Sequence, residues 1–145
     1  MSSCDEGPRA ALIVASELHE LARVSAWVRD WAEGQGLSAR LASRIDLCSC
    51  EVVTNIMTHA LGHAEKHIVL HLDRQGADVA LDVEDEGGQF DPRQVPQPAP
   101  ATSLQDARVG GWGIPILRRF SDDLRYRHED GRNRLTLLFR ATESP

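Results

Sequence analysis

The sequence predicts a two-layer α/β (α+β) sandwich in which helices cover one face of a mixed, mostly antiparallel sheet. Alternating apolar residues mark two hairpin-like pairs of strands, and helical periodicity marks three further segments. A chain of 145 residues is long enough for one core, so we expect a single domain over 1–145 with a flexible tail at 1–8. The predicted order is β, α, α, β, β, long loop, α, β, β.

The N-terminal part is predicted to form one strand and two helices. Residues 9–16, RAALIVAS, are a short, branched apolar run of the kind found in strands. Residues 17–36 place apolar side chains at three- and four-residue steps, and two glycines are expected to end this helix. Ser38 is a suitable N-cap for the next helix, over about 39–62.

The C-terminal part is predicted to form two hairpins and a short helix. Residues 66–74 and 79–85 alternate and are joined by the turn QGAD, which indicates an antiparallel hairpin. Residues 113–122 form a helix whose proline falls in the first turn, where its missing N–H costs nothing. The strands over 123–129 and 134–141 are joined by the turn DGRN.

The segment between the first hairpin and the last helix is too long for an ordinary connection. It holds four prolines and few large apolar residues. Loops of this length in compact domains are usually functional or disordered.

Composition excludes several classes of function. The net charge of −6 lacks the basic footprint of a nucleic-acid partner, and no apolar run is long enough to span a membrane. Cys4, Cys48 and Cys50 are odd in number and form no C-x-x-C pair, which favours a reducing cytoplasm over a disulfide or zinc framework. His59 and His63 have helical spacing but no third ligand nearby, so we do not expect them to bind a metal.

Three segments carry polar residues and glycines that suit a nucleotide site. Glu51, Asn55 and His59 lie four residues apart, on one face of the second helix. Asp85 ends a strand directly before two glycines, and GGWGI at 110–114 opens a helix after the long loop. Each segment alone has a simpler explanation: a solvated helix face, a plain turn or a flexible hinge. Together they are much more specific.

The chemistry of these groups matches a nucleotide with its metal. Glycines let the backbone approach a ligand closely, and a helix N-terminus attracts phosphate. A carboxylate accepts a hydrogen bond from an exocyclic amine. An asparagine oxygen is a suitable ligand for Mg²⁺, which takes few protein ligands besides phosphate and water. These groups are therefore the parts of a nucleotide site.

These segments resemble the N, G1 and G2 boxes of the GHKL ATPase superfamily, which includes gyrase, MutL, Hsp-type chaperones and histidine kinases. The resemblance is closest to a small bacterial branch, the anti-sigma factor serine/threonine kinases, and covers about residues 9–141. The branch motifs read E-x-x-x-N-x-x-x-H, D-x-G-x-x-F-D and G-G-x-G-[LI], and GRNRLTLLFR is similar to its ending G-N-x-L-T-L. Here the boxes stand as Glu51–Asn55–His59, Asp85–Gly87–Phe90–Asp91 and Gly110–Gly111–Gly113–Ile114.

The resemblance implies a GHKL histidine-kinase-like ATPase fold and a role for each residue. Glu51 would be the general base that takes the proton from a serine or threonine hydroxyl, and Asn55 would coordinate Mg²⁺ on the triphosphate. Asp85 would bind the adenine amine, Gly87 would let the base lie close to the backbone, and Thr136 would support adenine from the last strand.

The remaining implied contacts are with the phosphates. They would come from the start of the last helix, at Gly110, Gly111, Gly113 and Ile114. His59 would either help to order this region or serve only structurally. Residues 91–109 would form the ATP lid.

The resemblance further implies an ATP-dependent serine/threonine kinase that is also an anti-sigma factor in a partner-switching system. It would phosphorylate an anti-anti-sigma factor with a STAS domain and would form a homodimer. An alternative is a nucleotide-gated binding module without kinase activity, which would retain Asp85 and the glycines but would not need Glu51. A third alternative, the ATP-binding half of a histidine kinase, is disfavoured because no phospho-accepting helix pair precedes residue 9.

Overall fold

The computed structural model describes residues 9–59, 67–86 and 113–141. The predicted order of strands and helices is confirmed there. The elements are β1 (Ala10–Ala15), the short 3-10 helix η2 (Leu18–Glu20), α1 (Leu21–Gly34), α2 (Ala39–His59), β2 (His67–Gln75), β3 (Asp78–Asp85), α4 (Gly113–Phe120), β4 (Asp123–Glu129) and β5 (Arg132–Phe139).

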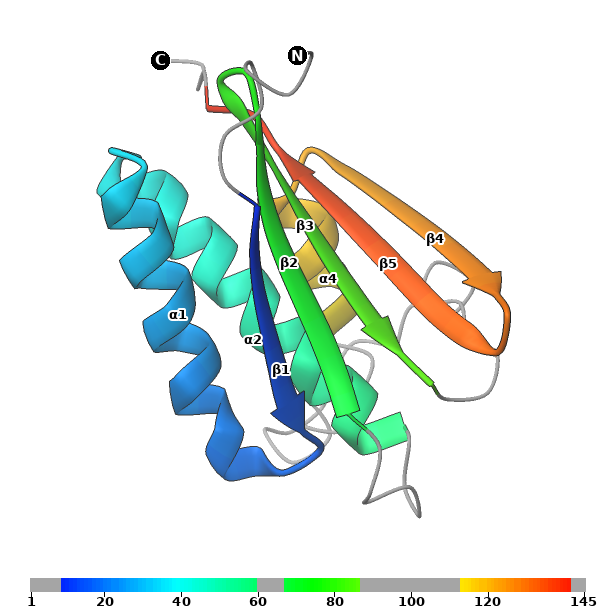
Figure 1. Ribbon diagram of the computed structural model, residues 1–145. Coiled ribbons are helices and arrows are strands. Elements are labelled where there is room, and N and C mark those ends of the chain that lie inside the picture. Colours follow the sequence, from blue (N-terminus) through cyan, green and yellow to red (C-terminus); the bar gives the residue numbers. More distant parts are fainter. Residues whose placement is uncertain (1–8, 60–66, 87–112, 142–145) are drawn as a thin grey trace, which may run out of the picture.

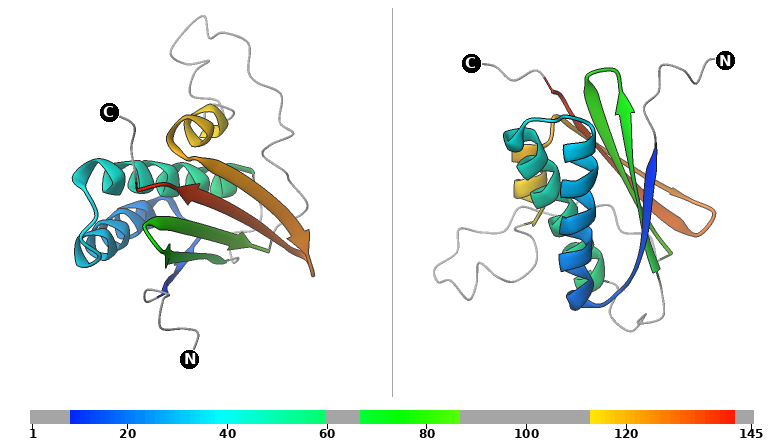
Figure 2. Two further views of the ribbon diagram at one scale, coloured as in Figure 1. Left: turned by 90° about the horizontal axis from the view of Figure 1, so that it is seen from above. Right: turned by 60° about the vertical axis from the view of Figure 1, so that its left-hand side comes forward.

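The five strands form one sheet in the order β1-β2-β3-β5-β4, and all four pairings are antiparallel. Helices α1, α2 and α4 cover the same face of this sheet, as the two views in Figure 2 show. The other face is not covered by any described element. The predicted two-layer sandwich with helices on one face is therefore confirmed.

Strand alternation sends every second side chain into the core between the sheet and the helices. Along β5 the buried and less buried positions alternate without exception, from Asn133 to Phe139. On β3 the inward series runs through Val79, Leu81 and Val83 and ends at Asp85. The inward series of β3 therefore brings a carboxylate to the edge of the apolar core.

The end of α1 and the start of α2 lie where local sequence signals place them. The backbone N–H of Leu41 donates to Ser38 Oγ at 3.1 Å, which confirms the predicted N-cap of α2. After α1 the chain turns at Gly36, which has φ +71°, a value that glycine adopts without strain. The N–H groups of Gly36 and Leu37 donate back to Glu33 and Ala32 and close the end of the helix.

Two predicted boundaries differ from the structure. The first residues of the predicted helix over 17–36 form η2, and the regular α-helix starts only at Leu21. The predicted turn DGRN is shorter than expected, because Asp130 and Gly131 alone turn the chain, both with positive φ. A two-residue turn of this kind matches the twist of the flanking strands, so strand pairing resumes at once at Arg132.

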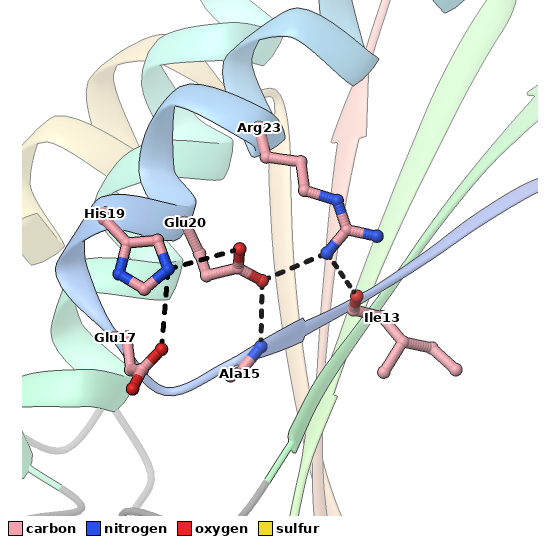
Figure 3. Close-up of polar contacts among 6 residues, drawn as sticks. All are labelled: Ile13, Ala15, Glu17, His19, Glu20 and Arg23. Atoms are coloured by element: carbon pink, nitrogen blue, oxygen red, sulfur yellow. Dashed lines mark hydrogen bonds and ion pairs between the residues drawn. The ribbon is translucent and has the colours of Figure 1, made fainter.

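The start of α1 is tied to the outer edge of β1 (Figure 3). The carboxylate of Glu20 accepts a hydrogen bond from the backbone N–H of Ala15 at 3.1 Å, and Arg23 donates to the carbonyl of Ile13 at 3.1 Å. Arg23 also pairs with Glu20 at 3.0 Å. Because the opposite edge of β1 pairs with β2, these side chains lie along the edge that no described strand occupies.

None of the described helices combines the length and the apolar character that crossing a lipid bilayer would require.

Candidate functional site

The described elements that carry Glu51, Asn55 and Asp85 come together at one end of the sandwich. In Figure 1 the C-terminal part of α2 and the end of β3 lie at the same end of the sheet, and the first turn of α4 points toward that end. Several predicted contacts fall outside the described residues: the glycines Gly87, Gly110 and Gly111 and the predicted lid over 91–109. For His59, Gly113 and Ile114 the structure gives only a backbone position in α2 or α4.

The polar stripe of α2 borders the core and does not point into open solvent. Glu51 and Asn55 are both half-buried, whereas their neighbours Val52 and Val53 are 2% and 0% exposed. The two polar residues are four apart in an unbroken α-helix, so they share one face and follow each other along it. Residues that served only solubility would be exposed, and Glu51 and Asn55 are not.

Glu51 is a half-buried carboxylate without a compensating partner among the described residues. Burial raises its pKa above the usual glutamate value, and no nearby cation or hydrogen-bond donor in the described part of the chain opposes that rise. A carboxylate with a raised pKa accepts a proton more readily than an exposed one does. Glu51 therefore has the properties of a general base.

Asp46, on the same helix, shows what a structural carboxylate looks like in this protein. It is 8% exposed and accepts hydrogen bonds from Ser25 Oγ at 3.0 Å and from Arg29 Nε at 2.9 Å. A second nitrogen of Arg29 lies 2.8 Å away. The charge of Asp46 is compensated and links α1 to α2, whereas the charge of Glu51 has no such role.

Asn55 carries a buried side-chain nitrogen that has no partner among residues 9–59, 67–86 and 113–141. Its side-chain nitrogen is shielded from solvent and makes no hydrogen bond within the described part of the chain. An unpaired buried donor costs about 1–3 kcal/mol, so natural proteins retain one where a ligand or another group completes it. The oxygen of the same amide is the type of neutral ligand that Mg²⁺ takes alongside phosphate. The amide of Asn55 therefore has the chemical groups that the predicted contact with Mg·ATP requires.

Asp85 is held by a residue that the sequence analysis did not select. Asn133 lies opposite Asp85 in the β3–β5 pairing, and its side-chain nitrogen donates to Asp85 Oδ1 at 3.2 Å. The oxygen of Asn133 accepts a hydrogen bond from the Tyr126 hydroxyl at 2.5 Å and lies 3.0 Å from His128 Nδ1. The available signal was polarity: Asn133 is a buried polar residue in a strand whose other inward residues are apolar.

Thr136 does not join Asp85. It is opposite Asp82 in the β3–β5 register, and its hydroxyl donates to Asp82 Oδ1 at 2.5 Å. Successive residues of a strand face opposite sides, so Asp82 and Asp85 lie on opposite faces of the sheet. The implied placement of Thr136 beside Asp85 therefore differs from the structure, in which Asn133 is the residue of β5 that lies opposite Asp85.

Helix α4 is fixed against α2 by one arginine. Arg44 Nε donates to the carbonyl of Phe120 at 3.1 Å, and another nitrogen of Arg44 pairs with Asp122 at 3.1 Å. The guanidinium lies 5.9 Å from the ring centroid of Phe139, and Leu117 of α4 is fully buried. These contacts anchor the C-terminal end of α4 against α2.

No group of three histidine, cysteine, aspartate or glutamate side chains that could hold a metal ion occurs among residues 9–59, 67–86 and 113–141.

The chain matches the family described as "Histidine kinase-like ATPase domain" over residues 14–139. It is 40% identical over 114 residues to the serine/threonine-protein kinase BtrW of Bordetella bronchiseptica, an alignment that covers 77% of this chain and 79% of that protein.

A solved structure shares the fold. The crystal structure of the RsbU and RsbW domains of Rv1364c from Mycobacterium tuberculosis matches with a TM-score of 0.67 and 19% identity. The match covers 92% of this chain and 32% of that longer one, and at this identity it supports the fold alone. The match over residues 14–139 and the 40% identity show that the chain belongs to the family of histidine kinase-like ATPase domains, in the branch that includes BtrW.

Proposed function

We propose that this chain is an ATP-dependent protein serine/threonine kinase and an anti-sigma factor of a bacterial partner-switching system. The observation that carries the proposal is Glu51, a half-buried carboxylate with a raised pKa, no compensating partner among the described residues, and Asn55 one helical turn away. The relative BtrW, itself named a serine/threonine-protein kinase, supports the reaction class.

The residues divide the work between binding and chemistry. ATP with Mg²⁺ supplies the phosphoryl group, which is transferred from the γ position to a serine or threonine oxygen of the partner. Glu51 accepts the proton that this hydroxyl loses, ADP is the leaving group, and Asn55 would hold Mg²⁺ on the triphosphate. Asp85 accepts a hydrogen bond from the adenine amine.

The proposed protein substrate is an anti-anti-sigma factor with a STAS domain, and the second partner is a sigma factor or another regulator. The likeness of the boxes to those of anti-sigma factor kinases supports both partners. Competition between the two for one surface needs only mass action, and phosphorylation of one partner removes it from the competition. A cytoplasmic location is part of the proposal, because a sigma factor acts there. The family expectation of a homodimer is part of this proposal.

A radiolabelled transfer assay tests the proposal. The purified chain is incubated with γ-labelled ATP, Mg²⁺ and a candidate STAS-domain protein, and a substrate in which the acceptor serine is replaced by alanine is the control. Label should enter the unaltered substrate alone. ATP binding without transfer to any such substrate would contradict the kinase and leave the nucleotide-gated binding module as the better explanation.

A further inference from the structure

We propose that Asn133 is a positioning residue that fixes the carboxylate of Asp85 and thereby makes the site select a purine with a 6-amino group. This inference rests on the adenine-binding role proposed for Asp85. It adds a residue outside all three boxes, on a different strand, and it concerns the choice of base, not phosphoryl transfer.

The contact between Asn133 and Asp85 is built into the sheet. The two residues are directly opposite in the β3–β5 register, on the face that the helices cover. Asn133 is 7% exposed, and its nitrogen donates to Asp85 Oδ1 at 3.2 Å. Opposed residues on paired strands keep a fixed separation, so this hydrogen bond does not depend on a flexible loop.

Two residues of β4 determine which way the amide of Asn133 points. The hydroxyl of Tyr126 donates to Asn133 Oδ1 at 2.5 Å, and His128 Nδ1 lies 3.0 Å from the same oxygen. Reversing the amide would turn its oxygen toward the carboxylate of Asp85, where two acceptors would repel. The contacts on one side of Asn133 therefore keep its donor directed at Asp85.

A carboxylate held in this way discriminates between purines at position 6. The amine of adenine donates to it, whereas the carbonyl of hypoxanthine presents a second acceptor. Sites built to hydrogen-bond one polar group reject analogues that lack it, because their own buried group is then left unpaired. A carboxylate free to rotate could relieve that conflict, but one held by Asn133 cannot. The positioning contact should thus sharpen the preference for adenine.

A purely structural role for this cluster makes a different prediction. Asn133, Tyr126 and His128 could serve only to pair buried polar groups at the end of the sheet. Loss of such a role would lower the affinity for all nucleotides by the same factor, because the protein would be less stable or the site distorted. The ratio of affinities for two purines separates the two roles.

The experiment compares ATP with inosine triphosphate, which differs at position 6 of the base. Calorimetry on the folded wild-type chain should show tighter binding of ATP. Asn133→Ala should lower the affinity for ATP about tenfold, the scale of one hydrogen bond to a charged group. Its affinity for inosine triphosphate should be nearly unchanged. Tyr126→Phe, which removes only the hydroxyl behind Asn133, should shift the ratio in the same direction by less.

Arg134→Gln is the matched control. Arg134 follows Asn133 on β5 but faces the other side of the sheet, where it pairs with Asp82 at 3.1 Å. Its ratio of affinities should equal that of the wild type.

Three results would overturn the inference: equal binding of both nucleotides by the wild type, equal weakening of both by Asn133→Ala, or an unchanged ratio in both variants. If Asn133→Ala does not fold, Tyr126→Phe decides alone. A wild-type chain that binds neither nucleotide would contradict the proposed function itself, a result distinct from those three.

Discussion

Replacing Glu51 with glutamine should separate the chemistry of this residue from its contribution to the fold. Glutamine has nearly the same size, and burial is the cause of the raised pKa of Glu51. The substitution therefore removes a charge that folding has to desolvate, and it breaks no ion pair among the described residues. We expect the variant to fold and to be at least as stable as the wild type at neutral pH.

The expected loss of phosphoryl transfer is large. A positioned general base contributes about 10²–10⁴-fold to a rate, so kcat should fall at least about a hundredfold, or about 2.7 kcal/mol in activation free energy. ATP affinity should change by no more than about 0.5 kcal/mol, the usual range for a substitution away from the binding contacts. A loss confined to kcat identifies an interaction made only in the transition state.

The pH dependence gives a second readout with a definite sign. Because the folded state raises the pKa of Glu51, the folded chain binds more protons than the unfolded chain between the usual glutamate value and the raised one. Stability must fall as pH rises through this window, and Glu51→Gln should lack that loss. The transfer rate should instead rise with pH through the same window in the wild type, because only the ionised carboxylate accepts a proton.

The assay is transfer of labelled phosphate to a STAS-domain substrate, with ATP affinity from calorimetry and stability from urea unfolding. Glu33→Gln, on the exposed side of α1, is the control and should match the wild type in all three measurements. A Glu51→Gln variant that transfers phosphate at the wild-type rate would refute the general-base argument. A marked loss of stability would show instead that the carboxylate has a structural partner.

Three further substitutions test the other assignments. Asp85→Asn should weaken ATP binding about ten- to a hundredfold in calorimetry, because a donor replaces an acceptor facing the adenine amine; unchanged affinity would remove Asp85 from the site. Asn55→Ala should abolish the difference in ATP affinity measured with and without Mg²⁺, since few protein ligands remain to replace it, whereas a preserved difference would contradict this. Thr136→Val should leave ATP affinity unchanged and lower the free energy of unfolding by about 1 kcal/mol through loss of its bond to Asp82, and weaker ATP binding would show that Thr136 does reach the site.

The helices and strands could be predicted because local sequence decides them. Ser38 and Gly36 act on the turns beside them, and the alternation of β2, β3 and β5 is visible residue by residue. The start of β5 at Arg132 could not be predicted in the same way. The turn is closed by two residues with positive φ, and a four-residue turn fits the same letters.

The site was only partly predictable, for a different reason. The side of the sheet that Thr136 faces can be predicted from its own strand. Its neighbours Leu135 and Leu137 point inward, so Thr136 points outward. The partnership of Asn133 with Asp85 could not be predicted, because strand register across residues 48 apart is set by packing and not by local sequence. The raised pKa of Glu51 could not be predicted either, because it depends on which side chains the fold places around the carboxylate.

The side chains on the outer edge of β1 have a consequence for solubility. Glu20 and Arg23 bind the backbone N–H of Ala15 and the carbonyl of Ile13, the groups that a further strand would use. An uncovered strand edge can pair with a strand of another chain. Here the side chain of Ile13, 56% exposed, would add an apolar contact to such pairing. The start of α1 thus protects this strand edge from pairing with other chains, and detaching it from β1 would expose the edge to self-association.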